Sequence, residues 1–250
     1  MKKTTSHSLL LLTSIFFVFS TCSKEDSFII PTRGLVCYYE FSGNAKDISA
    51  NGNDGFVIGA ELTNDRNGIL NEAYYFNGED TYIERNAPSF INDSVGTFIS
   101  WFKINNLLKV EYVGSVSDTS TIDYYISLIR IDPIDSTIGI YYREPLDANL
   151  ISGQIKIKTG VYNQCAMVAD GKRWHLYING QKDSLIVKAG MNSGKWFNNL
   201  SNNIDKFTIG NLIIKEPYTK PPFDGIIDQV LIYNRVLSDA EIKYIYLNTK

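Results

Sequence analysis

The sequence is poor in the residues that most metal centres and many active sites require. Its 250 residues include two histidines, three cysteines and three methionines. No cysteine-rich metal motif and no glycine-rich phosphate loop is present, so neither kind of site is predicted. His7 lies in an N-terminal apolar leader, and His175 lies in a predicted strand without an evident nucleophile. Neither histidine therefore predicts a catalytic base.

Basic residues are also too few to give the chain a positive charge. Acidic side chains outnumber basic ones by 27 to 24, and the formal net charge is −3 at pH 7. Loss of the leader, which carries Lys2 and Lys3 and no acid, makes the rest of the chain more negative. Nucleic acid is therefore not an expected partner.

One long uncharged run, residues 9–19, follows Lys2 and Lys3. This arrangement predicts a secretory signal peptide over residues 1–21. The apolar run is too short to span a bilayer comfortably, which disfavours an uncleaved membrane helix.

Cys22 closes the apolar run and is followed by the hydrophilic residues 23–27. This pattern resembles a bacterial lipobox, in which the cysteine becomes the acylated first residue of a lipoprotein. Phe19 and Thr21 differ from the usual leucine and small residue, so ordinary signal-peptidase cleavage with an incidental cysteine stays open. The charged residues just after Cys22 resemble the lipoprotein export signal of Bacteroidetes-type bacteria. The resemblance implies a lipidated tether over residues 22–33 and an outer-membrane lipoprotein on the cell surface, with a secreted or periplasmic location as the alternative.

From Gly34 onward, short strand patterns alternate with polar turns, and no internal domain boundary is evident. Residues 35–41 show the alternation of a strand with one face on a core. Residues 223–235 form a long strand pattern with apolar residues on both faces, which predicts a covered position beside that first strand. The spacing of the strands predicts one all-β domain over residues 34–250, a two-sheet antiparallel β-sandwich. Further strands are expected at residues 56–58, 73–77, 81–84, 97–104, 110–116, 124–131, 136–142, 151–158, 164–169, 174–178 and 206–210.

One short helix is expected at the C-terminus. Ser238 and Glu241 form a capping box, in which each side chain satisfies the other residue's backbone donor. Ile242, Ile245 and Tyr246 then mark one face, which predicts that the helix packs against the sandwich. Helix content is otherwise expected to be negligible.

Cys37 and Cys165 each lie inside an apolar strand. In an exported protein they could form one disulfide. The alternative is that both are small buried hydrophobic side chains, and the sequence alone does not place their Cα atoms.

A family resemblance is carried by residues 34–47, 51–55, 59–66, 73–78, 98–103, 176–180, 207–210, 223–228 and 233–238. Taken in order, these segments resemble a laminin-G-like domain of the concanavalin A-like lectin/glucanase superfamily. The resemblance implies a jelly roll of two antiparallel sheets with the first and last long strands adjacent. Tyr162 stands where members of the family commonly have tryptophan. Lectins, carbohydrate-binding modules, glycan hydrolases and protein-binding domains share this fold, so the fold alone does not choose a function.

Asp228 lies mid-strand between Ile226 and Val230, where a bare carboxylate is costly to bury. Related domains often hold a structural calcium near the join of the first loop and the last strand. Because oxygen ligands suit calcium, the resemblance implies one structural calcium ion bound by Asp47, Asn53 and Asp228. The alternative is that Asp228 accepts backbone hydrogen bonds from that same loop.

A glycan hydrolase of this superfamily needs two carboxylates placed across the scissile bond. The Glu-x-Asp-x-x-Glu or Glu-x-Asp-x-Glu run of the superfamily's glucanases does not occur in this sequence. Asp132 and Asp135 are the nearest pair, but Pro133 breaks the strand and the pair is typical of a turn. The sequence therefore predicts a non-catalytic protein, with a glycoside hydrolase as the least favoured class.

Carbohydrate binding needs an aromatic platform and polar groups for the sugar hydroxyls. Trp196, Phe197 and Asn198 in the Asn-rich loop of residues 190–203 are the first candidates, because loops of this length are often functional. Tyr218 in the Pro-rich loop is the second. For each aromatic residue, burial in the core is the alternative. The leading hypothesis is a cell-surface protein that binds glycan, and the alternative is a protein-binding adhesin or structural component of an outer-membrane assembly.

Overall fold

The computed structural model describes residues 30–200 and 203–249. The predicted signal peptide, Cys22 and the first part of the predicted tether lie outside the described residues. Within the part of the chain that the structure describes, no helix combines the length and the apolar character needed to cross a membrane.

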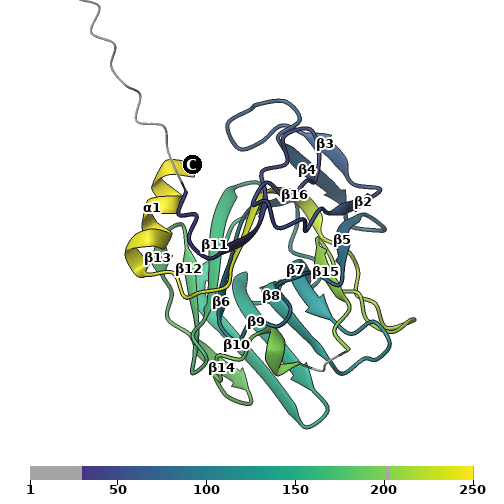
Figure 1. Cartoon of the computed structure of the whole chain (residues 1–250), viewed down its shortest axis with the longest axis vertical. Helices are drawn as coiled ribbons and strands as arrows, with labels where there is room; N and C mark the ends of the chain where they lie inside the picture. The colour runs from purple at the N-terminus through teal and green to yellow at the C-terminus, as the bar shows by residue number, and fades with distance from the viewer. Residues whose placement is uncertain (1–29, 201–202, 250) are drawn as a thin grey trace, which may run out of the picture.

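Two eight-stranded antiparallel sheets pack face to face (Figure 1). This arrangement confirms the predicted two-sheet antiparallel β-sandwich. The first sheet has the order β13 (Gln181–Lys182), β12 (Trp174–Ile178), β11 (Tyr162–Ala169), β6 (Gly96–Ile104), β16 (Asp224–Tyr233), β4 (Ala73–Asn77) and β3 (Glu61–Thr63), with β1 (Leu35–Tyr39) also paired to β16. The second sheet has the order β14 (Ile186–Ala189), β10 (Asp147–Lys156), β9 (Thr137–Glu144), β8 (Tyr125–Asp132), β7 (Glu111–Ser117), β15 (Lys206–Ile209), β5 (Tyr82–Asn86) and β2 (Phe56–Ile58).

β16 lies inside the first sheet and has partners on both sides. β6 pairs with one side, whereas β4 and β1 share the other side, one after the other. Tyr39 of β1 lies opposite Val230, so the first and last strands are neighbours, as predicted. Ile227 contributes to the core between the sheets, while Leu231 and Tyr233 pack in a second cluster on the outer face. Both faces of β16 are therefore covered, which explains its apolar residues on both sides.

The main core lies between the two sheets and is rich in aromatic rings. Phe98 of the first sheet and Phe207 of the second have ring centroids 6.4 Å apart. Cys37 and Cys165 lie in this core as free thiols. Burial raises the pKa of both thiols well above the ordinary value. Of the two alternatives for these cysteines, the structure has the small buried side chains and not the disulfide.

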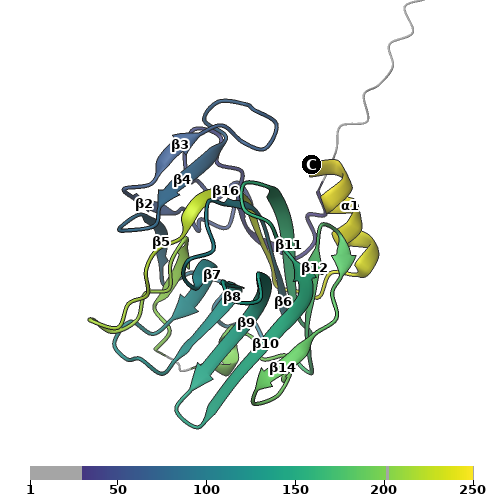
Figure 2. The ribbon, with the colours of Figure 1, turned by 180° about the vertical axis from the view of Figure 1, so that it is seen from behind.

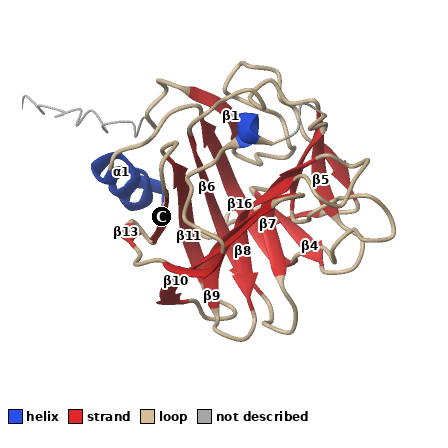
Figure 3. Ribbon diagram, turned by 90° about the horizontal axis from the view of Figure 1, so that it is seen from below, coloured by secondary structure: helices blue, strands red, loops and turns tan. Residues whose placement is uncertain are grey.

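The C-terminal helix α1 (Asp239–Thr249) covers the outer face of the first sheet over β1, β6, β11, β12 and β16 (Figures 2 and 3). The capping box is confirmed, because Ser238 N–H donates to Glu241 Oε2 at 2.8 Å and Glu241 N–H donates to Ser238 Oγ at 3.3 Å. Ile242 and Ile245 are buried against the sheet, and Tyr246 stacks on a tryptophan of β6. The predicted apolar face is therefore confirmed, and this region of the first sheet is closed to ligands.

Glu111, the first residue of β7, is a buried carboxyl group close to the main core. Its Oε2 accepts the backbone N–H of Asp224 at 2.8 Å, and its Oε1 has no partner within the described ranges. Burial raises the pKa of Glu111 to about 7, although the hydrogen bond from Asp224 and the charge of Lys109 oppose the shift.

The raised pKa predicts that stability falls as the pH rises through this range. Between about pH 4.5 and pH 7, the unfolded chain loses the Glu111 proton while the folded protein keeps it. The free energy of unfolding should therefore decrease by on the order of 2–3 kcal/mol across this window. Urea unfolding at a series of pH values should show that Glu111→Gln removes this slope, whereas Glu79→Gln, at an exposed turn, retains it. The same slope in the wild type and in Glu111→Gln would contradict the prediction.

Candidate functional site

The outer face of the second sheet carries a group of tyrosine and arginine side chains. Along β7, β8 and β9, Tyr112, Tyr125 and Tyr141 point away from the main core, because successive side chains of a strand point to opposite faces. The strand register places Arg130 opposite Tyr112 and Arg143 opposite Tyr125. The five side chains therefore share one face of three neighbouring strands.

The segment of residues 211–222 crosses the middle of this outer face. Ser115 Oγ donates a hydrogen bond of 2.8 Å to the carbonyl of Asn211, which ties the segment to β7. Leu212 and Ile214 are buried against the tyrosines of β7 and β8. The segment forms a ridge over β7 and β15, so the sheet beyond β7 stays open on one side.

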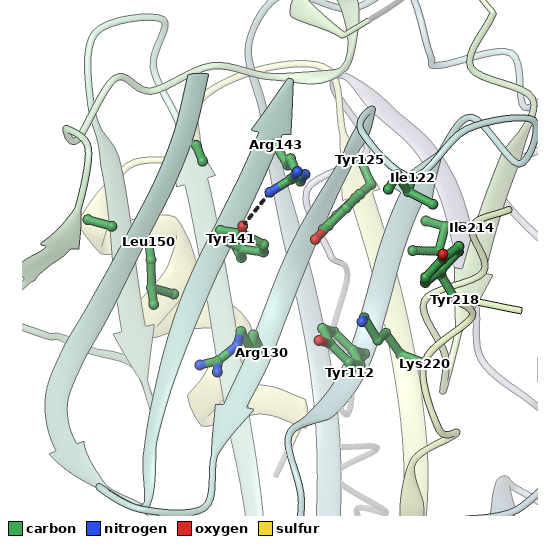
Figure 4. Close-up of a pocket in the computed structure, with 12 residues that line it drawn as sticks. Tyr112, Ile122, Tyr125, Arg130, Tyr141, Arg143, Leu150, Ile214, Tyr218 and Lys220 are labelled. Carbon is green, nitrogen blue, oxygen red and sulfur yellow. Dashed lines mark hydrogen bonds between the residues drawn. The ribbon is translucent and has the colours of Figure 1, made fainter. Parts of the chain in front are cut away.

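A cleft of about 500 Å³ lies on that open side, and we call it the tyrosine cleft (Figure 4). Its floor comes from β7 to β10, and the ridge supplies one wall. This volume is within the range of small-molecule and cofactor sites, about 300–1,000 Å³. The residues that line it are Tyr112, Ile122, Tyr125, Arg130, Tyr141, Arg143, Ala148, Leu150, Ala189, Ile214, Tyr218 and Lys220.

Both arginines of the tyrosine cleft are held by aspartates that do not line it. Arg143 donates from Nε and Nη2 to Asp123 Oδ1 at 3.1 and 2.9 Å, and its Nη1 lies 3.5 Å from the Tyr141 hydroxyl. Arg130 Nη1 lies 2.9 Å from Asp132 Oδ2. These ion pairs orient the guanidinium groups while the aspartates stay outside the cleft wall.

The hydroxyl groups of Tyr112 and Tyr125 stay protonated at neutral pH. Burial raises the pKa of Tyr112, and the neighbouring Arg130 opposes the shift. Burial also raises the pKa of Tyr125, and the nearby Tyr141 adds to the shift. The rings of Tyr125 and Tyr141 meet edge to face, with centroids 5.5 Å apart and an interplanar angle of 65°. The cleft therefore presents aromatic surfaces together with hydroxyl donors.

Of the residues predicted to bind carbohydrate, Tyr218 lies at the cleft and is 56% exposed. Trp196 and Phe197 are 0% and 1% exposed, and their rings stack on each other at 4.0 Å inside the core. The prediction that these two rings form a surface platform is therefore wrong. Asn198, in the 3₁₀ turn η1 (Phe197–Asn199), is exposed but is not part of the cleft.

The three predicted calcium ligands do not meet in one group. The Asp47 carboxylate accepts the backbone N–H groups of Tyr38 and Asn53, each at 2.9 Å. Asp228 instead forms an ion pair with Arg66 and accepts its backbone N–H at 3.2 Å. Within residues 30–200 and 203–249, no group of three or more His, Cys, Asp or Glu side chains is placed to hold a metal ion. The three residues thus do not fit a shared site. Calcium binding stays a prediction, and thermal melting with and without a chelator is its test.

A laminin G family model, described as the concanavalin A-like lectin/glucanases superfamily, matches residues 77–243. The chain belongs to this superfamily. The resemblance read from the sequence segments is thereby confirmed at the level of the superfamily. No curated protein matches the chain significantly.

Solved structures of the same fold include domains of glycan-processing proteins. The CBM40 of Ruminococcus gnavus IT-sialidase, bound to α2,3 sialyllactose, is 18% identical with a TM-score of 0.59, over 70% of this chain and 96% of that one. Domain 4 of a GH43 extracellular arabinanase from Geobacillus stearothermophilus, in complex with arabinotriose, is 19% identical with a TM-score of 0.62, over 84% and 96%. Trypanosoma rangeli sialidase is 18% identical with a TM-score of 0.62, and the match covers 88% of this chain but 34% of that chain. At such low identities, these likenesses show a shared fold.

Proposed function

We propose that the protein is a non-catalytic carbohydrate-binding protein and that its ligand lies in the tyrosine cleft. The observation that carries the proposal is the cleft beside the ridge, which is lined by the half-buried ring of Tyr141 and the exposed ring of Tyr218. The rings of Tyr112 and Tyr125 also line it but are largely buried against Leu212 and Ile214. A tyrosine ring offers an apolar surface to the C–H face of a sugar and a polar hydroxyl at its edge. The arginines add donors in fixed positions for sugar oxygens.

The similar structures support this proposal without naming the sugar. A CBM40 bound to sialyllactose and an arabinanase domain bound to arabinotriose have the same fold as this chain. In both cases a domain of this architecture holds an oligosaccharide. The chain of this protein covers 96% of each of these two domains, so the likeness includes nearly the whole of each.

The composition of the cleft supports binding without hydrolysis. Glycoside hydrolysis ordinarily needs a pair of carboxyl groups on either side of the scissile bond. Among the described residues, those that line the tyrosine cleft include no aspartate or glutamate. We therefore propose that bound glycan is released unchanged, and the appearance of new reducing ends from any polysaccharide would contradict this.

Tyr141→Ala is the substitution that tests the location of the site. Tyr141 of β9 lies between Arg143 of the same strand and Arg130 of β8, and its ring and hydroxyl would both be lost. For glycans identified on an array, we expect the dissociation constant to rise about tenfold or more, as for other central aromatic contacts. Isothermal titration calorimetry measures the change.

Tyr75→Ala is the matched control, because Tyr75 is 36% exposed on β4 of the first sheet, away from the cleft. It should bind glycan with the affinity of the wild type. Equal losses in both variants, or full binding by Tyr141→Ala, would place the site elsewhere.

We further propose that Cys22 carries the lipid that anchors the protein in the outer membrane, with the sandwich on the cell surface. The pattern around Cys22 in the sequence supports this proposal. Incorporation of labelled palmitate into the wild type, and none into Cys22→Ser, is the expected result. Labelling of both proteins or of neither would contradict lipidation at Cys22.

A further inference from the structure

We infer that the glycan bound in the tyrosine cleft carries acidic groups. This inference rests on the proposed function and adds the chemical class of the ligand. Three cationic side chains, Arg130, Arg143 and Lys220, line the cleft, and no carboxylate lines it among the described residues. The whole chain has more acidic than basic residues and a net charge of −3. The charged side chains that line the cleft are thus opposite in sign to the net charge of the protein.

The two arginines keep donors available for a ligand. A guanidinium group has five N–H donors in a planar fork. Asp132 contacts Arg130 through Nη1, which leaves donors on the other nitrogens. The Arg143 and Asp123 side chains are 36% and 30% exposed, and ion pairs this exposed contribute about 0–1 kcal/mol. An incoming carboxylate can therefore take up the Arg143 guanidinium group at small cost.

Lys220 comes from the ridge on the opposite side of the cleft from β9 (Figure 4). Within the described part of the chain, its ammonium group forms no ion pair. The ridge thus places a positive charge without an acidic partner at the edge of the tyrosine cleft. A neutral sugar would leave this charge unmatched, whereas an acidic sugar would pair with it.

The arginines lie on opposite sides of Tyr141 (Figure 4). Arg130 is paired with Gly139 across β8 and β9, and Gly139 is four residues from Arg143 along β9. Four residues of a strand span about 13 Å. The positive groups are therefore spread along the cleft, with an aromatic ring between them. This spacing favours an oligosaccharide with acidic groups on more than one sugar over a single acidic monosaccharide.

The test compares ligands that differ in charge but not in the sugar ring. The probes are galacturonic acid oligomers, the same oligomers as methyl esters, galactose oligomers of equal length, and sulfated galactose oligomers. We expect the acid to bind at least tenfold more tightly than its methyl ester, and this advantage to shrink at high salt. Tight binding of the sulfated oligomer, but not of the uronate, would also support an acidic ligand and would assign the charge to a sulfate ester.

Substitutions in the cleft assign the effect to the arginines. Arg130→Gln and Arg143→Gln should each weaken binding of the acidic oligomer about tenfold, since each removes charge-assisted hydrogen bonds. Arg173→Gln removes one exposed positive charge outside the cleft and should leave the affinity unchanged. The melting temperature of each variant shows whether the fold is intact.

The results that would overturn the proposed function differ from those that would overturn only the inference of an acidic ligand. If the acid, the ester and the neutral oligomer bind equally, and Tyr141→Ala abolishes binding of all three, the proposed function holds and the inference of an acidic ligand is overturned. If Arg173→Gln weakens binding as much as the cleft variants do, the effect comes from overall charge, and the inference is also overturned. If no oligosaccharide binds at all, both the proposed function and the inference fall.

Discussion

Replacing Asp228 by alanine is expected to lower the free energy of unfolding by about 3–5 kcal/mol, because it leaves a buried guanidinium group without its counter-ion. The side chains of Arg66 and Asp228 are 8% and 2% exposed. The Arg66 guanidinium group also lies 5.0 Å from the ring centroid of Trp101 and donates to the carbonyl of Thr249 at the end of α1. The ion pair therefore joins β16, the loop before β4 and the C-terminal helix. Urea unfolding of the wild type and the variant measures the loss.

Two further variants separate the buried pair from ordinary surface charge. Burial raises the pKa of Asp228, while Arg66 opposes the shift, so this carboxylate bears a large desolvation cost. The double variant Arg66→Met, Asp228→Leu should recover most of the stability, since two apolar side chains carry no such cost. Asp135→Ala, which breaks an exposed pair with Lys188, should cost less than about 1 kcal/mol. Equal losses from Asp228→Ala and Asp135→Ala would show that the buried pair has no special role.

Replacing Trp196 by alanine is expected to lower the free energy of unfolding by about 3–5 kcal/mol, as for other large aromatic side chains removed from a core. The indole ring is fully buried and stacks on Phe197. It also lies so close to Gly96 that a Cβ atom at that position would come within 2.4 Å of the ring. Alanine would therefore leave a cavity where β6 and the loop after β14 now fit closely.

The position of Trp196 gives this prediction a second readout, in glycan binding. Trp196→Phe should cost less than Trp196→Ala, because Nε1 of the indole has no partner among the described residues and most of the ring is kept. At temperatures where both variants stay folded, their glycan affinity should match that of the wild type. Loss of glycan binding by folded Trp196→Phe would instead favour the surface role that the sequence suggested.

The period-two alternation of apolar residues determined the fold class and most of the strands. The apolar residues on both faces of residues 223–235 predicted a covered strand beside residues 35–41, and the pairing of Tyr39 with Val230 confirms this. The capping box at Ser238 and the apolar face of α1 are local patterns of the same kind, so they too were readable. The short strands β3, β13 and β14 were not predicted, whereas the equally short β2 was. A segment of two to four residues rarely gives a periodic pattern that distinguishes a strand from a loop.

The candidate site was predicted only at Tyr218. Tyr112, Tyr125 and Tyr141 each lie in a predicted strand. The alternation therefore predicts which residues of the same strand lie on the same face as each tyrosine. The alternation does not predict which face of a sheet is covered by another element. This coverage decides whether a tyrosine packs against the protein or can contact a ligand. The prediction that Trp196 lies on the surface was wrong for a similar reason. A loop residue has no periodic pattern from which its burial can be judged.

The sequence by itself determined that this chain forms one β-sandwich with a docked C-terminal helix, because strand alternation and helix capping depend on neighbours along the chain. Only the tertiary structure decided where a ligand can lie. α1 covers the outer face of the first sheet over β1, β6, β11, β12 and β16, and the ridge of residues 211–222 covers only the middle of the second. Tyrosines and arginines from three strands lie together beside that ridge. Which of them meet depends on the pairing register between the strands, and no local sequence pattern specifies this register.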